Sequence, residues 1–273
     1  MPKSFLNTIV KHKQQEIALA KQRISRAALM KSIRKDRPRQ SLIQALSCRD
    51  QVNIVAEIKR ASPSKGVLCE SLDAAATALV YEKAGAAAIS VLTDSRFFNG
   101  GPDDLRDVKT VVTIPVLRKD FIISEYQVLE SATMGADAIL LIVRLLTVEK
   151  LQRYLDLCRA LNLEALVEVH SAEDVRKALK TDARLIGINN RDLSTFETHI
   201  TRALDMGKML GPNQIPVVAS GIHSRDDIAR NCRAGMNNFL IGESLVRAGN
   251  PGDQLRSYVE VQVASTLKME QRR

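Results

Sequence analysis

One corner of this chain recurs at a regular spacing: a helix-like segment ends at a glycine, and a short apolar run follows directly. The corner reads AGAAAISV from Ala84, MGADAILL from Met134 and AGMNNFLI from Ala234. Its glycines are 50 and then 100 residues apart, and another apolar run, Leu185–Asn189, lies between the last two. Glycine here is typical of the left-handed residue that ends a helix. A period near 50 residues indicates two strand–helix units in each repeat.

Strand-like and helix-like segments alternate along the chain. The predicted strands lie within 52–59 and at Ala87–Thr93, Pro115–Asp120, Asp137–Val143, Glu164–Val169, Leu185–Asn189, Ile215–Ala219 and Phe239–Ile241. The predicted helices are Leu72–Ala84, Asp103–Val111, Ser124–Met134, Thr147–Leu161, Ser171–Leu179, Ile200–Leu210, Ser224–Ala234, the short Glu243–Val246 and Pro251 to about Lys268. Serines suit the N-cap at Ser71, Ser124, Ser171 (with Asp174) and Ser224 (with Asp227). Eight such units predict an α/β fold, a (β/α)8 TIM barrel. An open doubly wound sheet is the alternative, although no GxGxxG follows the first strand.

Two more helices are predicted before the first strand. Phe5–Ile24 has the spaced apolar residues of an amphipathic helix, and Ser41–Leu46 forms a short second one. These segments are too small to hold a core of their own. We therefore expect one TIM-barrel domain over 1–273, with an N-terminal helical extension at 1–48 and the barrel at 49–273.

The amino-acid composition limits the cellular location and the kinds of binding partner that we expect. The four cysteines form no CxxC pair and the histidines do not cluster with them, so we expect reduced thiols, a cytoplasmic location and no zinc site. No apolar run approaches the roughly 18 residues of a membrane helix, so no membrane partner is expected. The net charge of +9 would suit nucleic acid, but aromatic residues are only 4% and the basic residues are dispersed. We expect a monomer with an anionic small-molecule substrate and no nucleic-acid partner, although a merely basic surface explains most of the charge.

The first strand carries two charged residues on a face that should be buried. Side chains alternate along a strand, so Glu57 and Lys59 share a face with Val55. Ionisable groups on the inner face of a buried strand are costly unless they are paired or used. A structural ion pair at a strand end and a functional site explain them equally well.

Polar residues also end five of the other predicted strands. They are Lys119 on the third strand, Glu168 on the fifth, Asn189 and Arg191 on the sixth, Ser220 and Gly221 on the seventh, and Gly242 and Glu243 on the eighth. The carboxyl ends of barrel strands share one rim, and that rim is where such barrels build their sites. The last four residues occupy the loops that usually hold a phosphate through backbone N–H groups. The Glu243 side chain would repel a phosphate, so we expect only its backbone to act; two ordinary turn glycines are the alternative.

The chain resembles the indole-3-glycerol phosphate synthase family. The resemblance rests on AEIKRASPSKG, VLTDSRFFNGG, PVLRKDFIISEYQ, LVEVHSAED, IGINNRDLSTF, ASGIHS and FLIGESLVR, and covers nearly the whole chain. It implies a carboxy-lyase of tryptophan biosynthesis without a metal or organic cofactor. The implied substrate is 1-(2-carboxyphenylamino)-1-deoxyribulose 5-phosphate, which closes a ring and loses carbon dioxide and water.

The resemblance also implies roles for the residues at the rim. Lys119 would be the general acid of ring closure, Lys59 the acid of the later dehydration and Glu168 the base or cation stabiliser, with the two lysines open to exchange. Glu57 would hold the lysines and contact substrate hydroxyls, and Asn189 and Arg191 would orient the anthranilate end, whose carboxylate would lie near Ser62 and Lys59. Phe121, Leu140 and Leu240 would form an apolar wall. Ser220, Gly221, Gly242 and Glu243 would hold the phosphate, with help from Lys59.

One position departs from the family pattern. The family usually has Glu before the Ser-Gly of the seventh strand, and this chain has Ala219. We expect a slower or differently tuned enzyme rather than a different reaction. A phosphosugar-binding barrel that has lost catalysis and another phosphate-barrel enzyme, such as a sugar-phosphate isomerase, are the alternatives.

Overall fold

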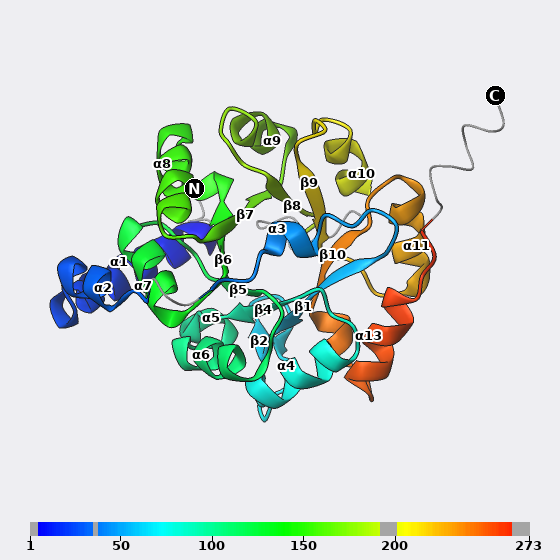
Figure 1. Cartoon of the computed structure of the whole chain (residues 1–273), viewed down its shortest axis with the longest axis horizontal. Helices are drawn as coiled ribbons and strands as arrows, with labels where there is room; N and C mark the ends of the chain where they lie inside the picture. The colour runs from blue at the N-terminus through cyan, green and yellow to red at the C-terminus, as the bar shows by residue number, and fades with distance from the viewer. Residues whose placement is uncertain (1–4, 35–37, 192–200, 264–273) are drawn as a thin grey trace.

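The computed structural model describes residues 5–34, 38–191 and 201–263. Eight parallel strands within these ranges close into a barrel, in the order β1-β10-β9-β8-β7-β6-β5-β4, so the predicted (β/α)8 barrel is confirmed over an open sheet (Figure 1). The barrel strands are β1 (Asn53–Ile58), β4 (Ala88–Leu92), β5 (Val116–Lys119), β6 (Ala138–Ile142), β7 (Glu164–Val169), β8 (Leu185–Asn189), β9 (Ile215–Ala219) and β10 (Asn238–Ile241). Leu92 pairs with Lys119 and Ile142 with Glu168, so neighbouring strands end at one level.

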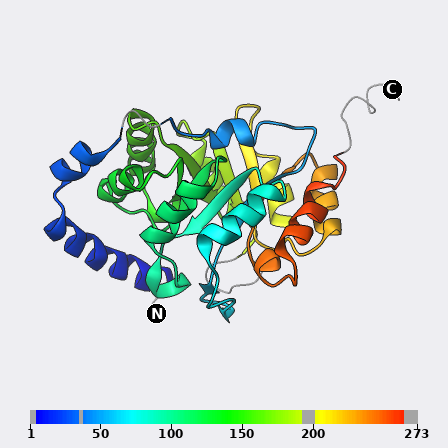
Figure 2. The ribbon, with the colours of Figure 1, turned by 60° about the horizontal axis from the view of Figure 1, so that its bottom comes forward.

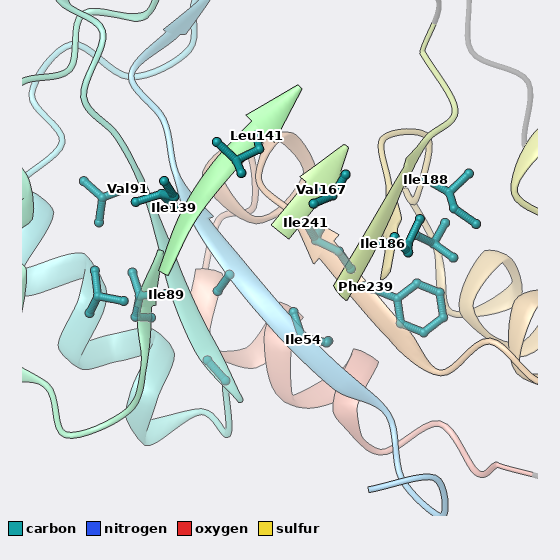
Figure 3. Close-up of a cluster of buried hydrophobic side chains, with 14 of the residues drawn as sticks. Ile54, Ile89, Val91, Ile139, Leu141, Val167, Ile186, Ile188, Phe239 and Ile241 are labelled. Carbon is teal, nitrogen blue, oxygen red and sulfur yellow. The ribbon is translucent and has the colours of Figure 1, made fainter. Parts of the chain in front are cut away.

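The barrel strands are buried on both faces because helices cover the outside. Val55 and Leu117 belong to the apolar cluster that fills the barrel interior. Ile54 and Phe239 belong to the larger cluster between the strands and the helices (Figure 3). This alternation places Glu57 on the same inner face as Val55, as the sequence predicts.

The helices that follow the strands form the outer layer. They are α4 (Ala74–Lys83), α6 (Pro102–Val111), α7 (Glu125–Met134), α8 (Val148–Ala160), α9 (Ala172–Ala178), α10 (Thr201–Gly207), α11 (Arg225–Arg233), α12 (Glu243–Val246) and α13 (Pro251–Val259). Ser124 caps α7, and Ser224 with Asp227 forms a reciprocal capping box on α11. The corner glycines Gly85, Gly135 and Gly235 have φ of 95°, 84° and 81°, which confirms their left-handed conformation.

Some details of the predicted helix ends differ from the structure. Helix α4 begins after Asp73 rather than Ser71, because the Asp73 carboxylate accepts the Ala76 N–H at 2.9 Å. The Ser171 hydroxyl does cap α9, but the Asp174 carboxylate accepts the N–H of His170 instead of returning a bond to Ser171. Helix α13 ends at Val259, and residues 264–268 of its predicted length lie outside the described residues.

The structure also contains several short elements that the sequence pattern does not predict. They are α2 (Arg26–Ser32), α5 (Ser95–Phe98), the 3-10 turn η1 (Val143–Leu145) and the antiparallel ribbon of β2 (Ala61–Ser62) and β3 (Gly66–Val67). The ribbon lies in the loop after β1. It therefore stands at the carboxyl ends of the strands, beside the predicted site.

The N-terminal segment wraps around the barrel. Helix α3 (Leu42–Ala45) closes the end where the strands begin: Leu42 enters the interior cluster, and the Ser41 hydroxyl and Ile43 N–H each donate to the Glu164 carboxylate at 2.7 Å. Helix α1 (Phe5–Arg23) lies along the side, where Ile17 packs with Tyr126 of α7. Figure 2 shows α3 and the β2–β3 ribbon at opposite ends of the barrel. Within the described ranges, no helix combines the length and apolar character that crossing a bilayer needs.

Candidate active site

A cavity opens at the carboxyl ends of the barrel strands, where the sequence predicts a site. It is lined by all of the residues predicted to act in catalysis or binding: Glu57, Lys59, Ser62, Lys119, Phe121, Glu168, Asn189, Arg191, Ser220, Gly221, Leu240, Gly242 and Glu243. Leu140 and Ala219 line the same cavity. Their common placement is confirmed; the role of each residue stays a prediction.

The first ion pair of the cavity joins Glu57 and Lys59. Glu57 lies on β1 and Lys59 follows that strand, and Lys59 Nζ is 2.7 Å from Glu57 Oε1. Burial alone would raise the pKa of Glu57, but attraction to Lys59 and to Lys119 outweighs it, and the pKa is lowered. The carboxylate therefore stays ionised at neutral pH and anchors the Lys59 ammonium inside the cavity.

The second ion pair joins Lys119 at the end of β5 to Glu168 on β7. Lys119 Nζ is 3.3 Å from Glu168 Oε2. Burial alone would lower the pKa of Lys119, but the nearby Glu168 and Glu57 carboxylates raise it above its ordinary value. Burial would raise the pKa of Glu168, and Lys119, His170 and Asn189 lower it well below its usual range. The cavity thus brings together two lysine–glutamate pairs, Glu57 with Lys59 and Glu168 with Lys119.

Arg191 connects the β1 loop to the segment after β10. Its Nη1 donates to the Ser64 hydroxyl at 2.9 Å, and its Nη2 lies 3.4 Å from Glu243 Oε2. The Asn189 side chain accepts the Arg191 N–H at 3.0 Å, which fixes the backbone from which the guanidinium extends. Arg191 Nε and Ser62 Oγ are buried without a hydrogen-bond partner among the described residues. Both atoms are suited to an anionic group in the cavity.

The loop after β9 turns sharply into the cavity. Ser220 has φ of 66° and Gly221 has φ of 79°, so two consecutive residues adopt the left-handed region that side chains disfavour. The Asn190 side chain donates to the Ser220 carbonyl at 3.1 Å and holds this turn. The left-handed Ser220 is an observed strain at a predicted binding loop.

The loop after β10 touches the first ion pair. A Cβ atom placed on Gly242 would lie 2.7 Å from Glu57 Oε1 and 3.0 Å from Glu57 Cβ. Glycine is therefore needed here for close packing against Glu57, in addition to any role toward a phosphate. The Glu243 carboxylate, expected from the sequence to repel a phosphate, is directed to Arg191 and to Arg247, whose Nε lies 3.5 Å from Oε1.

One wall of the cavity is apolar. Phe121, Leu140 and Leu240 lie on it as predicted, and the rings of Phe98 and Phe121 are 6.1 Å apart. Helix α1 adds residues that sequence reasoning missed: Phe5, Leu6 and Ile9. Their apolar spacing signals a packed helix face, but it does not say which part of the barrel the face covers.

His170 is a second residue that sequence reasoning missed. It is 2% exposed, and its Nε2 lies 3.3 Å from Glu168 Oε1, on the carboxylate oxygen that Lys119 does not contact. A usable signal was present: His170 stands two positions after Glu168, and that spacing places two residues on one face of a strand.

The comparisons with known proteins agree with this geometry. Residues 6–258 match the sequence profile of the indole-3-glycerol phosphate synthase family. Similar proteins named indole-3-glycerol phosphate synthase include that of Syntrophobacter fumaroxidans, 51% identical over 90% of this chain and 94% of that protein. That of Carboxydothermus hydrogenoformans is 46% identical over 92% of this chain and 98% of that protein.

Among solved structures, the fold is similar to 3-hexulose-6-phosphate synthase from Salmonella typhimurium, with a TM-score of 0.60 and 15% identity. The match covers 77% of this chain and 97% of that one. At this identity the likeness shows a shared barrel fold and nothing of the reaction. The sequence profile and the close relatives carry the assignment, and the chain belongs to the indole-3-glycerol phosphate synthase family.

Proposed function

We propose that this chain converts 1-(2-carboxyphenylamino)-1-deoxyribulose 5-phosphate to indole-3-glycerol phosphate, carbon dioxide and water, with the residues of the described cavity in the roles below. The observation that carries the proposal is the pairing of two lysines with two glutamates across one cavity. The reaction needs acids for a carbonyl oxygen and for a departing hydroxyl, and a group that removes a ring proton. Two ammonium groups and two carboxylates supply that set.

Lys119 is the acid of ring closure. As the aromatic carbon attacks the ketone, the carbonyl oxygen takes a proton from the Lys119 ammonium, and the carboxylate then leaves as carbon dioxide. Glu168, 3.3 Å from this amine, supports the role because it keeps Lys119 protonated and fixes its direction. The high pKa also makes Lys119 a weaker acid, so the developing negative charge on oxygen is stabilised mainly by the nearby ammonium.

Lys59 and Glu168 serve the dehydration. Lys59, held by Glu57 at 2.7 Å, protonates the departing hydroxyl, and Glu168 stabilises the cation and accepts the proton whose loss completes the five-membered ring of the indole. The exchanged assignment, with Lys59 acting first, has the same geometry in its favour. The lysine whose replacement stops decarboxylation is the first acid. Replacement of the other lysine should stop only the dehydration.

The substrate lies across the cavity between two anion-binding regions. The phosphate is placed at Ser220, Gly221, Gly242 and the backbone of Glu243, within reach of Lys59. The anthranilate carboxylate is placed near Ser62, Asn189 and Arg191, where Arg191 Nε and Ser62 Oγ are buried donors. The aromatic ring rests against Phe121, Leu140 and Leu240.

Purified protein given the substrate tests the proposal, because the indole product fluoresces where the substrate hardly does. Product formation at a catalytic rate is expected. Tight substrate binding without product would instead favour a binding barrel, the reading that Ala219 motivates. Neither product nor substrate binding, with turnover of another sugar phosphate, would favour a different phosphate-barrel enzyme.

The setting of the enzyme is also a proposal. All four cysteines are free, and Cys158 and Cys232 are buried thiols, which supports a reducing, cytoplasmic location. We propose a monomer. We also propose that it binds no nucleic acid, because its basic residues are dispersed along the sequence and aromatic residues make up only 4% of it. We also propose that 1–48 and 49–273 form one domain, since Lys13 of α1 pairs with buried barrel carboxylates.

A further inference from the structure

A buried charged cluster lies between α1 and the barrel, behind the cavity wall. Its centre is Lys13 of α1, which is 4% exposed. Lys13 Nζ lies 2.8 Å from Asp94 Oδ2 and 2.9 Å from Asp120 Oδ1, and 2.7 Å from Glu16 of its own helix. Both barrel carboxylates are buried, Asp94 completely. A lysine on an added helix thus joins two strand-end loops of the barrel.

Asp120 connects this cluster to the site because it follows Lys119 directly in the chain. Asp120 Oδ2 accepts from the Thr93 hydroxyl at 2.7 Å and lies 3.0 Å from Arg118 Nη2. Asp120 Oδ1 accepts the Phe121 N–H at 2.8 Å besides contacting Lys13. One carboxylate therefore fixes the backbone around Lys119 from both sides.

The neighbouring loop is held by the same lysine. The Thr93 N–H donates to the carbonyl of Lys119 at 3.1 Å, and Asp94 accepts the Phe97 N–H at 2.7 Å at the start of α5. The Phe97 ring stacks edge-on against Phe5 of α1, with centroids 5.6 Å apart. Lys13 thereby secures both the backbone that presents Lys119 and the helix whose first residues line the cavity.

We propose that Lys13 is a positioning residue for catalysis: through Asp120 and Asp94 it holds the Lys119 backbone and seats α1 as a wall of the cavity. This inference rests on the proposed role of Lys119. Lys13 itself stays outside the reaction, because its amine is engaged by three carboxylates. Removing one partner from such a buried set leaves uncompensated charge, and the backbone shifts to relieve it. A displacement of a catalytic group by about 1 Å is enough to cost on the order of 100-fold in rate.

The test compares Lys13→Met with a matched variant, Lys109→Met. Lys109 of α6 is also a buried lysine that pairs with a buried carboxylate, Asp137 Oδ2 at 2.6 Å, but this pair lies where β6 begins, away from the cavity. Both variants lose a buried charge pair and some stability. Turnover is measured at a temperature where circular dichroism shows every protein folded.

We expect Lys13→Met to lower kcat by about 10- to 100-fold, Lys109→Met to leave it near the wild-type value, and Lys13→Arg to recover much of the loss. Equal kcat in both methionine variants would overturn the proposal. A second readout does not depend on turnover. It is the NMR resonance of the Lys119 amine, recorded on protein labelled at its lysine side chains. The resonance is assigned to Lys119 because it is absent from the spectrum of Lys119→Arg. We expect this resonance to move in Lys13→Met and to stay in Lys109→Met; a resonance unmoved in Lys13→Met would also contradict the role. Wild-type protein that makes no product would overturn the proposed function, and the resonance would still decide the positioning role.

Discussion

At the scale of single residues, the site depends on how each charge is balanced. Lys119 and Lys59 are half-buried amines, and each has its own carboxylate partner, at 3.3 Å and 2.7 Å. Lys119 links the two ion pairs, because it lowers the pKa of Glu57 in addition to that of Glu168. Loss of the Lys119 amine therefore affects both pairs.

Replacing Lys119 by alanine is expected to reduce kcat by roughly 10²- to 10⁴-fold, the usual contribution of a positioned acid. Glu168 loses its partner at the same time, so part of the loss reflects a carboxylate with a raised pKa. Steady-state kinetics with fluorescence detection of the indole product measures the change. Turnover within a few-fold of wild type would remove Lys119 from the mechanism.

Ala219 tests a different residue-scale effect. It is 4% exposed on the cavity wall, and its carbonyl accepts the Asn190 N–H at 2.9 Å. A glutamate there would add a third carboxylate beside the two lysines. We expect Ala219→Glu to change kcat or KM for the substrate, with Ala219→Gln as the control for size. If Ala219→Glu leaves kcat and KM unchanged, this departure from the family pattern has no effect on the enzyme.

At the scale of elements, the loop after β10 and the strand β1 are coupled by close packing. Gly242→Ala places a methyl group 2.7 Å from Glu57 Oε1, so the carboxylate must move and the 2.7 Å contact with Lys59 is disturbed. We expect kcat to fall and KM to rise together. Gly249→Ala is the matched control, because the exposed Gly249 has nothing within 4 Å of the added atom. If Gly242→Ala changes only the affinity for the substrate, the glycine serves only phosphate binding.

Much of the element pattern could be predicted from the sequence. Strands such as Glu164–Val169 and Leu185–Asn189 have the predicted bounds because each contains a short apolar run, 165–167 and 185–188, that is bounded by polar residues. The start of α4 was missed because Ser71 and Asp73 are both good N-caps, and only the Asp73 contact with Ala76 decides between them. The residues at the rim were found because parallel strands present their carboxyl ends together.

The position of α1 could not be predicted in the same way. Its apolar face is visible in the sequence, but its seat depends on contacts between Lys13 and residues 81 and 107 positions away, Asp94 and Asp120. Local spacing carries no information about such partners. His170 was overlooked although its spacing from Glu168 indicated a shared face.

At the scale of the whole molecule, buried carboxylates tie stability to pH. Burial would raise the pKa of Asp120, but Arg118 and Lys13 lower it well below its usual value. A carboxyl group with a lowered folded-state pKa contributes stability above its unfolded pKa of about 3.9, and this contribution is lost as the pH falls toward the folded-state pKa. The melting temperature is therefore expected to drop in acid.

Asp120→Asn isolates this contribution. The variant is expected to be much less stable than wild type at pH 7, and the difference should shrink as the pH falls below about 4, where the wild-type carboxyl begins to bind a proton in the unfolded chain. Thermal unfolding followed by circular dichroism across this range measures both proteins. A constant difference at every pH would mean that Asp120 contributes by packing rather than by charge.

A crystal structure of the protein with indole-3-glycerol phosphate bound would test the proposed site most sharply. We expect the phosphate at Gly221 and Gly242, the indole ring against Phe121 and Leu240, and the amines of Lys59 and Lys119 facing the atoms that change bonding. A product bound in the reverse direction, or lying outside the cavity with both amines turned away from it, would overturn the proposed roles of these residues.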